Sequence, residues 1–279
     1  MPESLEAKRK ILRQLQQEAA ISESVSLSLH PNIVRFIGAV VSEHDPSDPL
    51  SGTIWMVYEY LKDGSLRSYL DKNGRALSLA DRTLIAIQLF DALSHLHSKN
   101  VVHRDLACRN ILVVLQDEKK LASIKICDFD LSRGLVAPAQ QASSASNNNN
   151  RTRVYRSPDA ERPVRWSAPE TLRDSVWTKY SDIYMAGATL HELFSNEEPF
   201  SSIADQLKVW VQVGDGATRM AEETKRAVEM KIYPQWVADV INRCCKYEAK
   251  DRVSIAEVKL CFFVSLSLSL SLSLSLSLS

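Results

Sequence analysis

The octapeptide His103-Arg104-Asp105-Leu106-Ala107-Cys108-Arg109-Asn110 is the most informative stretch of this 279-residue sequence. It follows a helix-like segment and precedes the apolar run Ile111–Val114, so it is expected to form a loop between a helix and a strand. An aspartate in such a loop can accept the proton of a hydroxyl group, and an asparagine five residues later can offer an oxygen to a metal ion. The loop turns back between them, which places both side chains on one cleft.

Two more motifs follow in order, Asp128-Phe129-Asp130 and then Ala168-Pro169-Glu170. The three motifs together resemble those of eukaryotic protein kinases, over roughly residues 10 to 262. Within that family, Arg109 and the segment Pro163–Glu170 are similar to the tyrosine-kinase and tyrosine-kinase-like branches. The resemblance implies an α+β, protein-kinase-like bilobal fold with a truncated N-terminal sheet lobe and a mostly helical C-terminal lobe.

Hydrophobic periodicity predicts the elements of these lobes. The elements expected before the octapeptide are a helix and two strands, at Ser4–Ile21, Ile33–Val41 and Thr53–Tyr60. Ser78, with Asp81 three residues later, is expected to cap a long helix. The buried side of that helix is predicted to consist of Ile85, Leu89, Leu93 and Leu96. Two short strands are expected at Ile111–Val114 and Ser123–Ile126, and the chain is expected to be mostly helical from Tyr180.

The resemblance divides the chain into three parts: residues 1–61 as a remnant of the N-lobe up to the hinge, 62–263 as the C-lobe, and 264–279 as a tail. Ser and Leu alternate strictly from Ser265 to Ser279, which is the pattern of an amphipathic strand with every Leu on one face. The interpretation that we prefer over the strand is a translated dinucleotide repeat with no folded role. Half of the tail residues carry hydroxyls, which argues against a membrane span.

Composition limits the partners. Lys and Arg number 34, as do Asp and Glu, so no basic field is present to hold a nucleic acid or an anionic membrane. The N-terminus shows no secretory signal, and the five cysteines lack metal-site spacing. These features favour a cytoplasmic protein with reduced thiols. The oligomeric state stays open.

The kinase resemblance assigns roles in catalysis, with ATP and Mg²⁺ as cofactors and a protein as substrate. Asp105 is the candidate catalytic base, and Asn110 and Asp128 are the candidate Mg²⁺ ligands, since hard oxygen donors suit that ion. Arg109 would help to place the tyrosine ring or the transferring phosphate. A surface ion pair is the alternative for Arg109.

The segment Met56–Leu61 resembles the hinge between the lobes. Adenine would form hydrogen bonds with the backbone of Glu59 and Leu61, and Leu112 would pack below the ring. Tyr58 would guard the back of the pocket.

Three regulatory residues are also implied. Arg104 would meet a phosphate on the activation segment, Tyr155 would carry that phosphate, and Glu18 would be the helix carboxylate that pairs with the phosphate-holding lysine of the family. The resemblance also implies two structural features. Glu170 and Arg252 would form a buried ion pair, and Asp182 would hold the backbone of the catalytic loop.

The sequence departs from the family in three ways. The first glycine is Gly38, so no glycine-rich loop precedes residue 30, and no strand carries the phosphate-holding lysine. Asp130 stands where the family has glycine, so backbone strain is expected at Asp130. The sequence therefore predicts a protein kinase that transfers the γ-phosphate of ATP to a protein hydroxyl, with tyrosine expected and serine or threonine as the alternative. A catalytically impaired binding module and an incomplete gene model of an active kinase are the competing interpretations.

Overall fold

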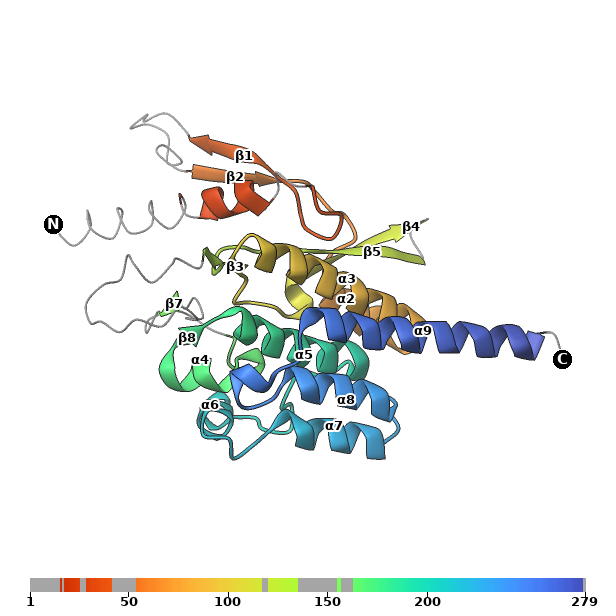
Figure 1. The fold of residues 1–279 in the computed structure, drawn as a ribbon. Coiled ribbons are helices and arrows are strands. Elements are labelled where there is room, and N and C mark those ends of the chain that lie inside the picture. The colour runs from red at the N-terminus through yellow and green to blue at the C-terminus, as the bar shows by residue number, and fades with distance from the viewer. Residues whose placement is uncertain are drawn as a thin grey trace.

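A computed structural model of the chain describes residues 16, 18–25, 29–41, 54–116, 120–134, 155–156 and 163–277. A helical segment and short strands form a small upper part, and long helices form the larger lower part (Figure 1). This arrangement confirms the expected α+β, bilobal architecture.

The small part contains the helical segment 18–25 and a two-stranded antiparallel sheet. β1 (Phe36–Val41) pairs with β2 (Ile54–Tyr58), and Val40 lies opposite Trp55. Both strands fall inside their predicted ranges, as their β-branched and aromatic residues favour. Of the predicted helix Ser4–Ile21, residues 4–15 and 17 lie outside the described residues, and the described part continues beyond Ile21 to residue 25.

A second hairpin joins the two parts. β4 (Ile111–Gln116) pairs antiparallel with β5 (Lys120–Ile126), which confirms the two short strands predicted after the octapeptide. The chain before β1 is bonded to the end of β5, because Val34 N donates to Ile126 O at 2.9 Å and Ile126 N donates to Asn32 O at 2.9 Å. The remaining pairs are short: β3 (Val101–Val102) with β6 (Arg133–Gly134), and β7 (Tyr155–Arg156) with β8 (Val176–Trp177).

The lower part is helical, as predicted. Its helices are α2 (Leu66–Asn73), α3 (Leu79–Ser98), α4 (Pro169–Asp174), α5 (Lys179–Ser195), α6 (Gln206–Gly214), α7 (Met220–Glu229), α8 (Gln235–Cys244) and α9 (Ile255–Ser277). α3 begins where the sequence indicates: the Ser78 side chain accepts from Asp81 N at 3.1 Å, and Ser78 N donates to the Asp81 carboxylate at 3.2 Å. This reciprocal cap satisfies backbone groups that the first helical turn leaves unpaired.

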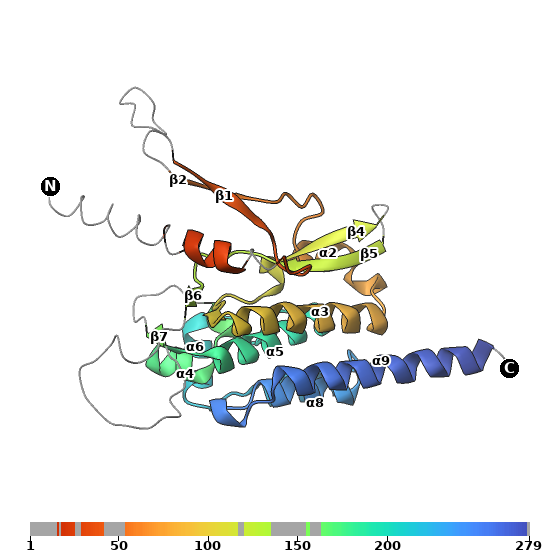
Figure 2. The same ribbon diagram turned by 45° about the horizontal axis from the view of Figure 1, so that its top comes forward.

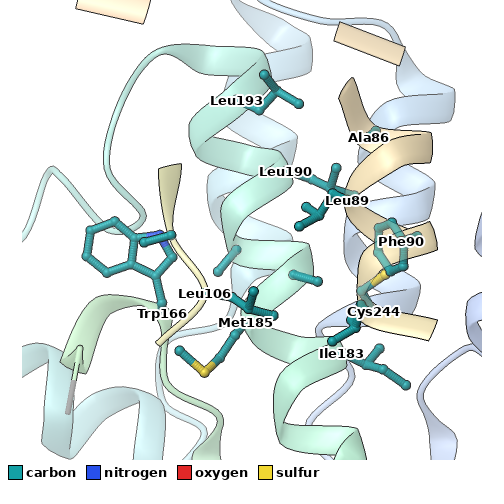
Figure 3. Close-up of a cluster of buried hydrophobic side chains, with 14 of the residues drawn as sticks. Ala86, Leu89, Phe90, Leu106, Trp166, Ile183, Met185, Leu190, Leu193 and Cys244 are labelled. Carbon is teal, nitrogen blue, oxygen red and sulfur yellow. The ribbon is translucent and has the colours of Figure 1, made fainter. Parts of the chain in front are cut away.

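The core lies between α3, α5 and α8 (Figure 3). The four residues predicted for the buried side of α3 (Ile85, Leu89, Leu93 and Leu96) are all fully buried. Truncation of one of them, such as Leu89→Ala, is expected to cost about 2–5 kcal/mol of folding free energy. This core fixes α5 beneath the catalytic loop, with Leu106 of the loop inside the same cluster.

The interpretation of the Ser-Leu tail as an amphipathic strand is wrong, because α9 continues as a helix to Ser277 (Figure 2). α9 begins as a packed helix: Val258 and Phe262 are buried, and Phe262 stacks on Phe194 with ring centroids 6.4 Å apart. Once such a helix has formed, adding one residue costs far less than nucleation, so the backbone continues into the tail. Within the described part of the chain, no helix is both long and apolar enough to span a bilayer.

Candidate active site

The catalytic loop is held from below by Asp182 of α5. The carboxylate of Asp182 is fully buried and accepts the backbone N–H groups of His103, at 2.8 Å, and Arg104, at 3.0 Å. His97 of α3 approaches the same carboxylate through Nε2 at 3.0 Å. The expectation that Asp182 holds the loop backbone is confirmed.

His103 connects this loop to the Asp128-Phe129-Asp130 motif. Its Nδ1 accepts the N–H of Asp105 at 3.2 Å, so the ring proton lies on Nε2, which donates to the Cys127 carbonyl at 3.1 Å. The His103 ring also lies 5.4 Å from the ring of Phe129, which is buried. The His103 imidazole therefore sets the relative positions of the candidate base and the candidate metal ligand.

Asp105, Asn110 and Arg109 form one cluster. Asn110 donates its side-chain nitrogen to the Asp105 carboxylate at 2.7 Å and to the Asp105 carbonyl at 2.8 Å. Arg109 forms an ion pair with the other carboxylate oxygen, and its guanidinium lies 5.0 Å above the ring of Trp166. The amide nitrogen of Asn110 is thus occupied, and its oxygen is the atom left for a cation.

Backbone strain occurs at two residues of the site. Arg104 and Asp128 have φ angles of 73° and 66°, a region that non-glycine residues rarely adopt. Asp130 has no positive φ, so the expectation of strain at the glycine position is wrong. The strained residue is instead Asp128, the candidate metal ligand two residues earlier. The hydrogen bond from His103 to Cys127 O helps to hold the Asp128 backbone in this conformation.

A pocket of about 170 Å³ lies beside this cluster. Its lining residues come from both parts of the molecule: Glu18, Val34, Tyr58, Glu59, Leu112, Cys127, Asp128, Phe129 and Asp130. Small-molecule sites usually measure about 300–1,000 Å³, so a whole nucleotide would extend beyond this pocket. Leu112 lies in the wall, as the resemblance implies, whereas Leu61 is half-buried and is not one of these lining residues.

The acidic groups in the pocket are not anticipated by the sequence. The carboxyl groups of Glu18 and Asp130 lie within hydrogen-bonding reach of each other, and Tyr58 donates its hydroxyl to Glu18 at 3.0 Å. Two carboxyl groups can share a hydrogen bond only if one holds a proton. Desolvation, followed by the contact with Asp130, raises the pKa of Glu18 to about 7. Desolvation and the charge of Asp130 also raise the pKa of Asp128.

The resemblance pairs Glu18 with the phosphate-holding lysine of the family. In the structure the partners of Glu18 are Asp130 and Tyr58. The sequence signal for this pairing is the carboxylate at position 130, which predicts backbone strain and an extra charge beside the metal site but not a contact with Glu18.

The hinge is tied to β5. Lys125 donates to the Glu59 carboxylate at 2.6 Å, and the N–H of Arg35 donates to the same oxygen at 2.7 Å. Desolvation opposes ionisation of Glu59, but these two contacts outweigh it and lower the pKa of that carboxyl. The Glu59 N–H is bonded to the Arg35 carbonyl at 2.9 Å, so its own carbonyl is the group that an adenine ring could meet.

Arg104 is nearly inaccessible. Its guanidinium lies 4.5 Å below the Trp177 ring, and Nη1 donates to Leu131 O at 2.9 Å. The backbone of Tyr155 pairs with that of Trp177, so the candidate phosphosite lies one strand away from the residue that covers Arg104. A phosphate could reach this guanidinium only after Trp177 had moved.

The predicted buried ion pair is present. Arg252 makes two parallel hydrogen bonds to Glu170, at 2.7 and 2.6 Å, which fixes the Ala168-Pro169-Glu170 motif to the chain before α9. A buried carboxylate that sequence reasoning missed is Glu192 of α5, which accepts Cys108 N at 3.0 Å and Trp166 Nε1 at 3.1 Å. Its spacing of ten residues after Asp182 leaves the two side chains about 80° apart around the helix, so helical periodicity gives no signal that Glu192 also faces the loop.

The fold, the anchored loop and the three ordered motifs define a protein kinase domain. The chain belongs to the protein tyrosine and serine/threonine kinase family, which it matches over residues 4–262. Catalytically active members of this family are phosphotransferases.

The curated relatives span both branches of this family. The chain is 30% identical over 231 residues to the tyrosine-protein kinase csk-1 of Caenorhabditis elegans, covering 82% of this chain and 36% of that protein. It is 32% identical over 233 residues to the serine/threonine-protein kinase CTR1 of Arabidopsis thaliana, covering 82% and 24%. The inactive tyrosine-protein kinase kin-32 of Caenorhabditis elegans is 34% identical over 166 residues, covering 60% and 16%. The chain thus spans about a third or less of the length of these relatives.

Proposed function

We propose that this chain transfers the γ-phosphoryl group of ATP to a hydroxyl group of a protein, with tyrosine as the expected acceptor, in cytoplasmic signalling. The observation that carries the proposal is the anchored cluster of Asp105 and Asn110, 2.7 Å apart, on a loop whose backbone Asp182 fixes. Phosphoryl transfer depends mainly on positioning and charge neutralisation, and a rigid loop supplies the first of these.

Each residue of the cluster would have a separate task. Asp105 would accept the proton of the incoming hydroxyl, and Arg109, held over Trp166, would orient the acceptor ring or the phosphate. The carbonyl of Glu59 and the side chain of Leu112 would position adenine, and the backbone of Leu61 would bind it from the hinge. An acceptor tyrosine is favoured because the exposed guanidinium of Arg109, held over the buried Trp166 ring, offers a flat cation to an aromatic ring beside Asp105.

The residues fit Mg²⁺ by their chemistry. Asp128 offers a carboxylate, Asn110 offers the amide oxygen that its hydrogen bonds leave available, and both are hard donors. The described residues contain no group of three or more His, Cys, Asp or Glu arranged for a metal ion, so phosphate oxygens and water would complete the coordination. Bound Mg²⁺ would neutralise charge on the phosphate oxygens.

The test is Asp105→Asn in the full chain, with transfer of isotope from labelled ATP to a protein acceptor. The asparagine retains the shape and cannot act as a base, so transfer should fall at least about 100-fold while the melting temperature stays unchanged. Asp239→Asn is the control, because Asp239 lies on α8 and bonds only to Gln235 in the described structure. Equal transfer by the Asp105 variant and the parent would remove Asp105 from the role of base.

A catalytically silent binding module is the second candidate. It is favoured by the pairing of Glu18 with Asp130, because these two carboxyl groups and that of Asp128 line the pocket where nucleotide phosphates would need a cation. Thermal shift with ATP, with and without Mg²⁺, distinguishes the candidates. A Mg²⁺-dependent shift accompanied by labelled acceptor supports the enzyme, whereas neither effect supports the binding module.

A further inference from the structure

Glu192 lies under the junction between the catalytic loop and the segment that precedes α4. It belongs to the last turn of α5, and its side chain is almost completely buried. One carboxylate oxygen accepts both Cys108 N, at 3.0 Å, and Trp166 Nε1, at 3.1 Å. The other oxygen lies 3.5 Å from Nη1 of Arg67 on α2. A buried carboxylate is retained only where such donors compensate its desolvation.

The two donors on the shared oxygen belong to different functional segments. Cys108 lies three residues after Asp105 in the catalytic loop, and Trp166 ends the short turn Val164–Trp166. The Trp166 ring carries the guanidinium of Arg109 at 5.0 Å, and Arg109 in turn pairs with Asp105. The contacts therefore close a ring that runs from Asp105 through Arg109, Trp166 and Glu192 back to the loop at Cys108.

We propose that Glu192 is a positioning residue that sets where Arg109 lies relative to Asp105, and thereby sets the binding of the protein acceptor. Asp182 and Glu192 divide the loop between them: Asp182 holds the backbone before Asp105, and Glu192 holds the backbone after it. Only the Glu192 contact reaches the Trp166 ring on which Arg109 lies. Loss of Glu192 would thus affect the acceptor side of the site and leave the nucleotide side unchanged. The part concerning acceptor binding rests on the proposed kinase activity.

Two substitutions isolate this contact. Glu192→Gln keeps the shape but removes the charge and leaves a single acceptor oxygen, which cannot accept from both Arg67 and the two donors at the shared position. Trp166→Phe keeps a smaller aromatic ring under Arg109 and removes the indole N–H that Glu192 accepts. Glu223→Gln is the matched control, because Glu223 is a buried carboxylate of α7 paired with Arg226 and is not part of the ring.

The experiment measures amide hydrogen exchange and steady-state transfer in the full chain. We expect Glu192→Gln to accelerate exchange at Cys108 about tenfold, while His103 and Arg104, held by Asp182, exchange at the parent rate. We also expect the KM for the protein acceptor to rise about tenfold with the KM for ATP unchanged. The double variant Glu192→Gln, Trp166→Phe should raise the KM for the acceptor no more than either single variant does. Both substitutions break the same contact, between Glu192 and the Trp166 indole.

Two results would overturn the proposal: exchange at Cys108 that does not change in Glu192→Gln, or exchange that accelerates equally at His103 and throughout α5. The second result would mean that Glu192 supports only the stability of the fold. If the parent chain transfers no phosphate, the proposed function fails by itself, and exchange at Cys108 still decides whether Glu192 positions the loop.

Discussion

Glu18 makes the stability of this chain depend on pH in a direction opposite to that of an ordinary salt-bridged carboxylate. Its pKa is raised from 4.5 to about 7 by desolvation and by Asp130, so the folded chain holds a proton that the unfolded chain has released. The unfolding free energy contributed by Glu18 is therefore complete below pH 4.5 and is lost as the pH rises to about 7. At about 1.4 kcal/mol per pKa unit the upper limit is about 3 kcal/mol, and screening at this half-exposed site reduces it to about 1–2 kcal/mol.

The assay is urea unfolding of the full chain between pH 4.5 and 8, with Glu18→Gln and the control Glu222→Gln on the exposed side of α7. As the pH rises across this range, the parent should lose about 1–2 kcal/mol of unfolding free energy relative to Glu18→Gln. Asp130→Asn should retain part of the slope, because desolvation, the largest cause of the shift, remains. The reasoning is refuted if Glu18→Gln and the parent show parallel curves.

Three further predictions follow from single contacts. Arg252→Met should lower the unfolding free energy by about 3–5 kcal/mol, because it leaves Glu170 without its charged partner, and a second substitution, Glu170→Leu, should recover part of this loss in urea melts. Cys127 should react slowly with an ATP-site-directed electrophile at pH 8, since desolvation raises its thiol pKa to about 12, and Mg-ATP should block the reaction. Equal labelling with and without nucleotide would contradict that assignment. Tyr155→Phe should lower transfer, and mass spectrometry should find phosphate on Tyr155 in active protein; unchanged transfer by the variant would place the switch elsewhere.

Features with a local or motif-based signature could be predicted from the sequence. The Ser78 cap of α3 involves residues three apart, and the buried side of α3 repeats at helical spacing, so both follow from short-range rules. Asp182 and the Glu170–Arg252 pair were identified through the family resemblance, and the structure places both as expected. The roles of Asp105, Asn110 and Asp128 in catalysis remain predictions.

The features that could not be predicted depend on contacts between distant segments. Glu18 and Asp130 are separated by more than a hundred residues, and nothing in either neighbourhood indicates that two carboxyl groups meet. Glu192 faces the same way as many apolar residues of α5, so periodicity alone assigns it to the core. In the Ser-Leu tail the local pattern is misleading. Strict alternation is the pattern of a strand, but the packed start of α9 determines that the helix continues.

The two buried carboxylates of α5 and the carboxyl groups of the pocket have opposite effects on the catalytic loop. Asp182 accepts two backbone N–H groups of the loop and Glu192 accepts one, so these hydrogen bonds hold the loop around Asp105 from below. Glu18 meets acidic groups and no cation among the residues that shift its pKa, so its contact with Asp130 persists only while it carries a proton. The lower half of the site is therefore held by buried hydrogen bonds, and the upper half changes charge near neutrality. The catalytic loop therefore keeps its geometry while the pocket that faces it titrates. As Glu18 takes up a proton, the electrostatic cost of bringing nucleotide phosphates to the loop falls.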